Sequence, residues 1–447
     1  MIDGSLLQFF TDPILRAPTI GCILMCISSG LVGVVVFLKK QSLIGEALSH
    51  ATYPGVILGA MIAGVFEIDS SNDVLITIFV MLGASFTALI GLWCIHFLQH
   101  KVKVPSDSAL CFVLAAFFGI GLTLASQMQF AFSSLYRQAQ IYLYGQAATM
   151  IDIHIWVYSI LFVCVTIVIS LFYKEIRTIA FDREYARSLG INTRTVDHII
   201  YLLIVIALVI GIRSVGVVLM SAMLIAPAVA ARQYTHKLYI TFILAALFGG
   251  VSGFLGNYFS ISIGNALAIH FPTHHFALAT GPMIVIVASI LCLLSLLFAP
   301  ERGLVIRYLR IAHFRYHCLQ ENLLKACWRF PEGKTIPFDE ISKYQSLSPT
   351  YLRFVLASLA WQGWLLKEPA GYRLSPEGRA WSTRIVRLHR LWEVYLVDYL
   401  GMGVERVHRS AEEMEHIITP ELERELTLLL NDPKRDPHSQ PIPKEFE

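Results

Sequence analysis

Long apolar stretches alternate with short polar segments over the first two thirds of the chain. From Pro18 to Pro300 the apolar runs follow one another closely, whereas Glu301 to Glu447 mixes polar and apolar residues like an ordinary soluble protein. A helix needs about 20 apolar residues to cross a bilayer. The candidate runs are 18–38, 51–67, 73–97, 108–127, 152–173, 198–212, 215–231, 238–258 and 279–299. These nine runs become eight if two neighbouring runs form one helix. We therefore expect an all-α polytopic membrane domain of eight or nine transmembrane helices.

Basic residues are concentrated in alternate loops between these runs. If the N-terminus lies outside, the outer loops hold little beyond Arg137 and Arg213. The inner loops then hold Lys39, Lys40, Lys101, Lys103, Lys174, Arg177, Arg183, Arg187, Arg194, Arg232 and Lys237. Cytoplasmic loops of membrane proteins are enriched in Lys and Arg. We therefore expect a multi-pass protein of a bacterial inner membrane whose C-terminal part lies in the cytoplasm.

Composition supports a membrane protein and narrows its chemistry. Hydrophobic residues make up 55% of the 447 residues and charged residues only 15%, against about half and a quarter in soluble proteins. Most of the eight cysteines lie inside apolar runs, and no C-x-x-C pair occurs. Neither a zinc knuckle nor a disulfide framework is therefore indicated.

The segment Gly333-Lys334-Thr335 looks like the end of a phosphate-binding loop. The first glycine of that motif should stand five residues earlier, where the chain has Trp328. The motif therefore fails. We expect a chain that is not itself an enzyme, with any ATP hydrolysis carried out by a separate subunit.

Two ionisable residues stand at the start of the second apolar run. Glu46 and His50 are spaced i, i+4, so on a helix they share a face. Ionisable groups at a membrane span are costly and usually functional, and a carboxylate with an imidazole suits Mn, Fe or Zn. The spacing alone is equally compatible with a pair that faces water or lipid head groups.

Several motifs resemble the zinc/manganese/iron ABC permease family, of the ABC-3 type. They are Gly45 to Ala51 followed by Pro54-Gly55, Val215-Gly216 through Ala228, and Thr280-Gly281-Pro282. The resemblance implies that Glu46 and His50 line the metal path, with Glu46 where Asp is commoner. It also implies three partners: an ABC ATPase subunit, a periplasmic or surface metal-binding protein, and a second permease subunit that is either another copy or a paralogue.

The loop 174–197 contains the expected contact to the ATPase. The stretch from Asp182 to Leu189 has the pattern of a short amphipathic helix, which by family resemblance docks the ATPase. The residues assigned to docking are Asp182, Glu184, Arg187 and Leu189. Without the resemblance, this stretch would be interpreted as a solvated loop.

The soluble part begins with three helices and a hairpin. Ser348-Pro349-Thr350 opens a helix with an N-cap followed by proline, and Gly363 ends it. The pattern is typical of a winged helix-turn-helix with 349–362 as recognition helix, although a three-helix domain that binds protein fits equally well. The residues predicted to contact operator DNA are Ser348, Pro349, Thr350 and Arg353. Beyond Arg353 this helix is poor in phosphate-binding groups.

Carboxylates and imidazoles recur at helical spacing after the hairpin. His389 and Glu393 are spaced i, i+4. After Gly401 a second group follows, made up of His408, Glu412, Glu415 and His416. Such ligands suit Mn or Fe. The region resembles the DtxR family of metal-dependent repressors, which implies one site from His389, Glu393 and His408 and a homodimer. The implied second site is Glu412, Glu415 and His416, with Asn322 contributed by the first helix.

These patterns predict one chain with two functions. The domains are a permease at 1–300, a basic junction at 301–316, a winged helix at 317–380 and a metal-binding and dimerisation segment at 381–447. A divalent metal is both transport substrate and corepressor, Fe or Mn ahead of Zn. The alternative is a metal sensor that closes the transporter without binding DNA. The basic, aromatic junction suits a helix along the inner leaflet, and we expect a cytoplasmic fragment to be released close to His317.

Overall fold

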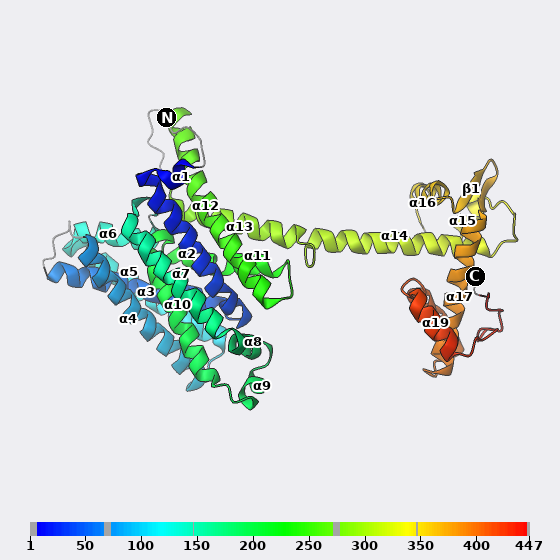
Figure 1. Ribbon diagram of the computed structural model, residues 1–447, viewed down its shortest axis with the longest axis horizontal. Coiled ribbons are helices and arrows are strands. Elements are labelled where there is room, and N and C mark those ends of the chain that lie inside the picture. Colours follow the sequence, from blue (N-terminus) through cyan, green and yellow to red (C-terminus); the bar gives the residue numbers. More distant parts are fainter. Residues whose placement is uncertain (1–6, 67–72, 146, 271–277, 346, 445–447) are drawn as a thin grey trace. The chain divides into compact units, whose positions relative to one another are not determined.

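The computed structural model describes residues 7–66, 73–145, 147–270, 278–345 and 347–444. It divides into an N-terminal unit, Met1–Arg307, and a C-terminal unit, Tyr308–Glu447. Both units are drawn in Figure 1 and are described separately.

The N-terminal unit is built from helices. Eight of its described helices (α2, α3, α4, α5, α7, α10, α12 and α13) are long and apolar enough to cross a membrane, and α11 is shorter. The elements are α1 Gln8–Thr11, α2 Pro13–Leu38, α3 Leu43–Val65, α4 Asp73–His100, α5 Ser106–Ala131, α6 Ser133–Tyr144, η1 Ala147–Thr149, α7 Asp152–Leu171, α8 Tyr173–Phe181, α9 Arg183–Ser188, α10 Thr193–Val215, α11 Val217–Arg232, α12 Leu238–His270 and α13 Thr280–Phe298. The expected polytopic helical domain is confirmed.

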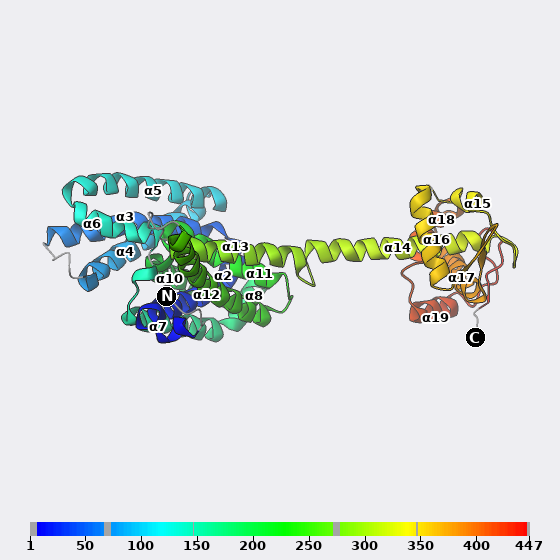
Figure 2. The same cartoon turned by 90° about the horizontal axis from the view of Figure 1, so that it is seen from above.

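The long helices run side by side in a bundle. The short helices α8 and α9 lie at one end of it and α6 at the other (Figure 1), while α5 and α7 occupy opposite edges in the view from above (Figure 2). We placed the turn between α10 and α11 at Arg213. It lies instead at Gly216, whose φ of 94° favours glycine. Arg213 is in the last turn of α10, where it donates a hydrogen bond to the Thr77 hydroxyl at 2.7 Å.

Helices α3 and α4 touch backbone to backbone. A Cβ atom at Gly55 would lie 2.1 Å from the carbonyl oxygen of Gly83, and one at Gly59 would lie 2.4 Å from that of Phe79. Such distances leave no room for any side chain, so the glycines allow the two helices to approach closely, as small residues do in membrane bundles. The expected run at 51–67 therefore belongs to a longer helix that starts at Leu43 and carries Glu46 and His50 in its first two turns.

The C-terminal unit combines two long helices, α14 and α17, with shorter helices and one hairpin. Its elements are α14 Leu304–Trp328, α15 Phe338–Ser342, α16 Pro349–Trp361, β1 Leu365–Glu368, β2 Gly371–Leu374, α17 Pro376–Asp398, α18 Val404–Met414 and α19 Pro420–Leu429. The strands are antiparallel, with Leu365 opposite Leu374. Ser348 caps α16 by accepting from the Tyr351 amide, and Gly363 follows the helix with φ 84°. The expected order of helices and hairpin is present.

Helix α14 joins two segments that the sequence pattern treats separately. The basic junction at 301–316, which suits a helix of its own, is continuous with the first helix of the soluble part, because α14 runs from Leu304 to Trp328. No glycine or proline interrupts 304–328, so nothing in the chain breaks the helix there. Its last turns bury Leu323 and Leu324 against the core side chains of α16, such as Leu352.

Candidate metal sites

The first candidate site lies at the start of α3. His50 is buried, with its ring edge-on to Phe118 at 4.8 Å between centroids, and Glu46 is half-buried one turn earlier. The Nδ1 atom of His50 is buried and has no hydrogen-bond partner among the described residues. A buried polar atom without a partner is costly. The site therefore offers one carboxylate and one unused imidazole nitrogen on the same face of a helix.

The stretch expected to dock an ATPase is helical, as α9. Asp182 caps it by accepting from the amides of Glu184 and Tyr185 at 2.9 and 3.1 Å, and Arg187 pairs with Glu184 at 2.6 Å. Leu189 is 57% exposed and Phe181 91% exposed. Apolar side chains left uncovered beside a rigid short helix make a surface suited to a protein partner.

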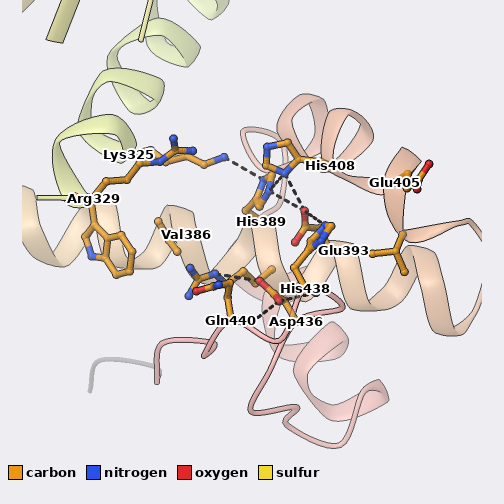
Figure 3. A pocket seen from close by; sticks show the side chains of 13 residues that line it. Lys325, Arg329, Val386, His389, Glu393, Glu405, His408, Asp436, His438 and Gln440 are labelled. Carbon is orange, nitrogen blue, oxygen red and sulfur yellow. Dashed lines mark hydrogen bonds and ion pairs between the residues drawn. The ribbon is translucent and has the colours of Figure 1, made fainter. Parts of the chain in front are cut away.

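The second candidate site, in the C-terminal unit, brings together His389, Glu393 and His408. His389 Nε2 lies 3.0 Å from His408 Nδ1 and 3.1 Å from Glu393 Oε1, and the last two atoms are 3.0 Å apart. Three ligand atoms about 2.1 Å from one ion, at right angles, are about 3.0 Å from one another. The three residues meet in a cavity of about 450 Å³ (Figure 3).

Two helices position this triad. Helix α17 carries His389 and Glu393 on one face, and a turn at Gly401, with φ 63°, is followed by α18, which brings His408 against them. His389 and Glu393 are buried, whereas the His408 side chain is 51% exposed. An ion could therefore enter from the His408 side.

Glu415 and Lys325 lie behind the triad. Glu415 has a buried carboxylate that accepts from His389 Nδ1, and Lys325 Nζ donates to both Glu415 oxygens at 3.0 and 2.8 Å. The same Nζ lies 3.1 Å from His389 Nδ1 (Figure 3). Lys325 was not among the residues singled out from the sequence, because a lone lysine on an amphipathic helix normally faces water.

His416 pairs with a residue that the sequence analysis missed. Its Nδ1 lies 2.6 Å from Glu321 Oε2, while its Nε2 is buried without a hydrogen-bond partner among the described residues. Burial and then the negative charge of Glu321 raise the pKa of the Cys318 thiol. Cys318 and Glu321 are spaced i, i+3, a signal that was available in the sequence. Asn322, the residue expected to contribute from this helix, stays a prediction.

Glu412 and His438 lie on the open side of the triad. Glu412 is half-exposed and 3.5 Å from His408 Nε2, so it adjoins the first set of ligands. His438, also missed, places Nε2 3.8 Å from Glu393 Oε1. The backbone around it is fixed by Asp436, which accepts from the amides of His438 and Gln440. Within the described residues Glu412, Glu415 and His416 form no second close group of ligands.

The charges of the triad are strongly coupled. Burial raises the pKa of Glu393, but hydrogen bonds from His389 and His408 outweigh it and bring the pKa to about 2. Burial lowers the pKa of His389, yet its contacts with Glu393 and Glu415 prevail and leave the pKa raised. A carboxylate that stays ionised beside two imidazoles is a donor set that suits divalent Mn, Fe or Zn. The residues present therefore fit such an ion.

The outward face of α16 is mostly apolar. Arg353 is exposed and stacks over the Phe338 ring at 5.1 Å. Phe354 is 62% exposed and Trp361 89% exposed. This surface has one cation for a phosphate and a large uncovered aromatic area.

Comparisons with known proteins assign both parts of the chain. Residues 11–299 match the ABC 3 transport family, and residues 375–444 match the iron dependent repressor, metal binding and dimerisation domain.

Relatives cover nearly the whole chain. A probable metal transport system membrane protein of Chlamydia trachomatis serovar D is 36% identical over 443 residues, 97% of each chain. The manganese transport system membrane protein MntC of Bacillus subtilis is 32% identical over 386 residues, 86% of this chain and 84% of that one. The solved structure of PsaBC from Streptococcus pneumoniae in complex with Fab is 25% identical, with a TM-score of 0.56 over 69% of this chain and 98% of that one. The chain is therefore a multi-pass membrane protein that belongs to the ABC 3 transport family and carries an iron dependent repressor domain near its C-terminus.

Proposed function

We propose that this chain is the membrane subunit of an ABC importer for a divalent metal, and that its C-terminal unit is a metal-dependent repressor. The observation that carries the proposal is the triangle of ligand atoms from His389, Glu393 and His408, about 3 Å on each side, in the same chain as an ABC 3 membrane domain. Relatives are named for manganese and, in Treponema pallidum, for zinc transport. Manganese is the metal we propose first.

In the N-terminal unit, the metal path passes Glu46 and His50. The unpaired, buried Nδ1 of His50 is the nitrogen available to an ion, and Glu46 supplies the charge. Two ligands from one helix hold an ion weakly, which suits a path that must also let it go. The exposed apolar residues around α9 contact a separate ATPase subunit. A surface or periplasmic binding protein delivers the metal, and a second permease subunit completes the pathway.

In the C-terminal unit, the metal is a signal. His389, Glu393 and His408 bind it, and His438 from the C-terminal turn supplies a fourth ligand. Glu415 and His416, together with Glu321 and Cys318, supply further polar groups beside this metal site. When metal binds, the three-helix and hairpin region, as a dimer, contacts operator DNA through Ser348, Pro349, Thr350 and Arg353. Repression of import genes would then follow from a high cytoplasmic metal concentration.

A second function is favoured by the surface of α16. Because its outward face carries Phe354 and Trp361 with few cations, it suits a protein contact better than a phosphate backbone. In this alternative the unit senses metal and closes the transporter without DNA. Arg353 would then have no special role.

One experiment separates the two functions. The purified C-terminal unit is titrated onto labelled DNA from upstream of its own operon, with and without Mn(II), and anisotropy is recorded. Metal-dependent binding that is weakened by Arg353→Ala supports the repressor. If the unit binds metal but no DNA, and transport by the full chain falls as internal Mn(II) rises, the gating function replaces it.

We also propose that the repressor acts after release from the membrane, with a fragment that begins near His317. The residues of α14 before His317 are largely exposed, and cleavage there requires only local unwinding of the helix. Immunoblotting of cells with an antibody to the C-terminus tests this. A single membrane-bound band of full length, in both metal-rich and metal-poor growth, would exclude release.

A further inference from the structure

Lys325 is a buried positive side chain in direct contact with the candidate ligands of the C-terminal unit. It is only 8% exposed, and its ammonium group contacts Glu415 at 2.8 and 3.0 Å and His389 Nδ1 at 3.1 Å. A buried ammonium is costly unless it is paired and hydrogen-bonded. The site therefore holds a cation of its own, contributed by the protein.

Lys325 and Glu415 favour different tautomers of the His389 ring. An N–H donated by Lys325 to Nδ1 needs the lone pair of that nitrogen, which puts the ring proton on Nε2. Glu415 instead accepts a proton from Nδ1, which leaves the lone pair on Nε2. Only the second tautomer can give Nε2 to an ion that also binds Glu393 and His408, because a protonated nitrogen is no ligand.

The charge of Lys325, like its hydrogen bond to His389, disfavours a bound metal ion. Its ammonium neutralises Glu415 and adds positive potential next to the triad, and both effects oppose a divalent cation in a buried site. We propose that Lys325 is an internal cation that competes with the metal for the His389, Glu393 and His408 site and so raises the metal concentration at which the site fills. This inference rests on the metal site proposed above.

The position of Lys325 connects this competition to the rest of the unit. It follows Leu323 and Leu324 on α14, whose side chains are packed in the core with Leu352 and Leu356 of α16. When the ion binds, Lys325 withdraws from His389, and the last turns of α14 must adjust against α16. The lysine is thus a positioning residue that links occupancy of the site to the helix that bears the exposed aromatic surface.

The test is Mn(II) binding to the purified full-length chain, followed by the EPR signal of free Mn(II). The sensor site is defined as the binding that Glu393→Ala removes. Lys325→Met should tighten this component by about tenfold or more, since a nearby positive charge is lost. Lys325→Gln, which keeps two N–H donors for Glu415 and so preserves packing, should tighten it as well.

Two matched variants control for charge and position. Lys325→Arg keeps the positive charge and should leave the affinity within about threefold of the parent, well under one tenfold step. Lys343→Met removes an exposed lysine from the same unit and should change nothing. A second readout is the melting temperature. Without metal, Lys325→Met should melt at a lower temperature than the parent because the buried Glu415 carboxylate loses its ammonium partner, and Mn(II) should raise the melting temperature of this variant by more.

The outcomes distinguish a failure of the role of Lys325 from a failure of the metal site itself. If Glu393→Ala removes a site but Lys325→Met and Lys325→Gln bind as the parent does or more weakly, Lys325 is no competitor and the inference is overturned. Equal tightening by Lys325→Arg would also overturn it, because charge would not be the cause. If Glu393→Ala binds as many Mn(II) ions as the parent, the proposed metal site itself is wrong, and the inference fails with it.

Discussion

The two candidate metal sites differ in the number of chain segments that form them. In the N-terminal unit α3 alone supplies Glu46 and His50, and His50 keeps an unpaired nitrogen. In the C-terminal unit α14, α17, α18 and the C-terminal turn converge, and the candidate ligands His389, Glu393 and Glu415 already have partners. The comparison shows that the α3 pair keeps an unused ligand atom, whereas the ligand atoms of the C-terminal cavity are already paired with one another and with Lys325.

The largest effect is expected at the α3 site, where Glu46 and His50 are the two candidate ligands. His50→Ala removes the one imidazole of the α3 site, so uptake of radiolabelled Mn(II) by the reconstituted transporter should fall to background while membrane insertion is unchanged. His100→Ala, at the exposed end of α4, is the matched control and should transport normally. Unchanged uptake by His50→Ala would show that the path does not pass this site.

A smaller loss is expected in the C-terminal unit, because several groups share the ion. Glu415→Ala removes the acceptor that orients His389, and loss of such an outer partner typically weakens metal binding by about 10–100-fold. Calorimetry with Mn(II), compared with Mg(II), measures the change. Glu425→Ala, an exposed glutamate on α19, should bind like the parent. Identical titrations for Glu415→Ala and the parent would contradict the proposed sensor.

His438 tests whether the open side of the triad contributes to metal binding. Its ring is 41% exposed and approaches Glu393 from the open side, so His438→Ala should weaken Mn(II) binding by about tenfold, at the lower end of the range for groups that support a metal site. His317→Ala changes an exposed histidine outside the cavity and is the control. A loss as large as that of Glu415→Ala would mean that the open side dominates the affinity.

The smallest effect is expected from pH without metal. The pKa of His389 is raised above 6.5, so its contribution to stability is complete below pH 6.5 and is lost as pH rises through the raised value. The pKa of Glu393 is lowered to about 2, so its contribution is present above pH 4.5 and is lost only as pH falls towards 2. The metal-free C-terminal unit should therefore lose stability as the pH rises above 6.5.

Thermal melts between pH 6 and 9 measure this loss. Glu393→Gln, which removes the charge that His389 is paired with, should show a flatter profile than the parent over the same range. A parent protein whose melting temperature rises steadily above pH 6.5 would contradict the assignment.

Sequence patterns predicted what depends on local spacing. Apolar runs located the long helices, and i, i+4 spacing placed His389 with Glu393 on one face of α17. The patterns failed where distant segments meet. Lys325 and His438 are far from the triad in sequence, and neither has a spacing signal that ties it to the other ligands. The continuity of α14 was not predicted, because a charged amphipathic junction is compatible with both a separate helix and a continuous one.

The glycine contact between α3 and α4 has a mechanical consequence. Because the backbones touch at Gly55 and Gly83, the two helices have little freedom to slide or tilt independently. A motion that displaces α4 would therefore displace α3 with it. Glu46 and His50, both on α3, would keep their spacing during such a motion.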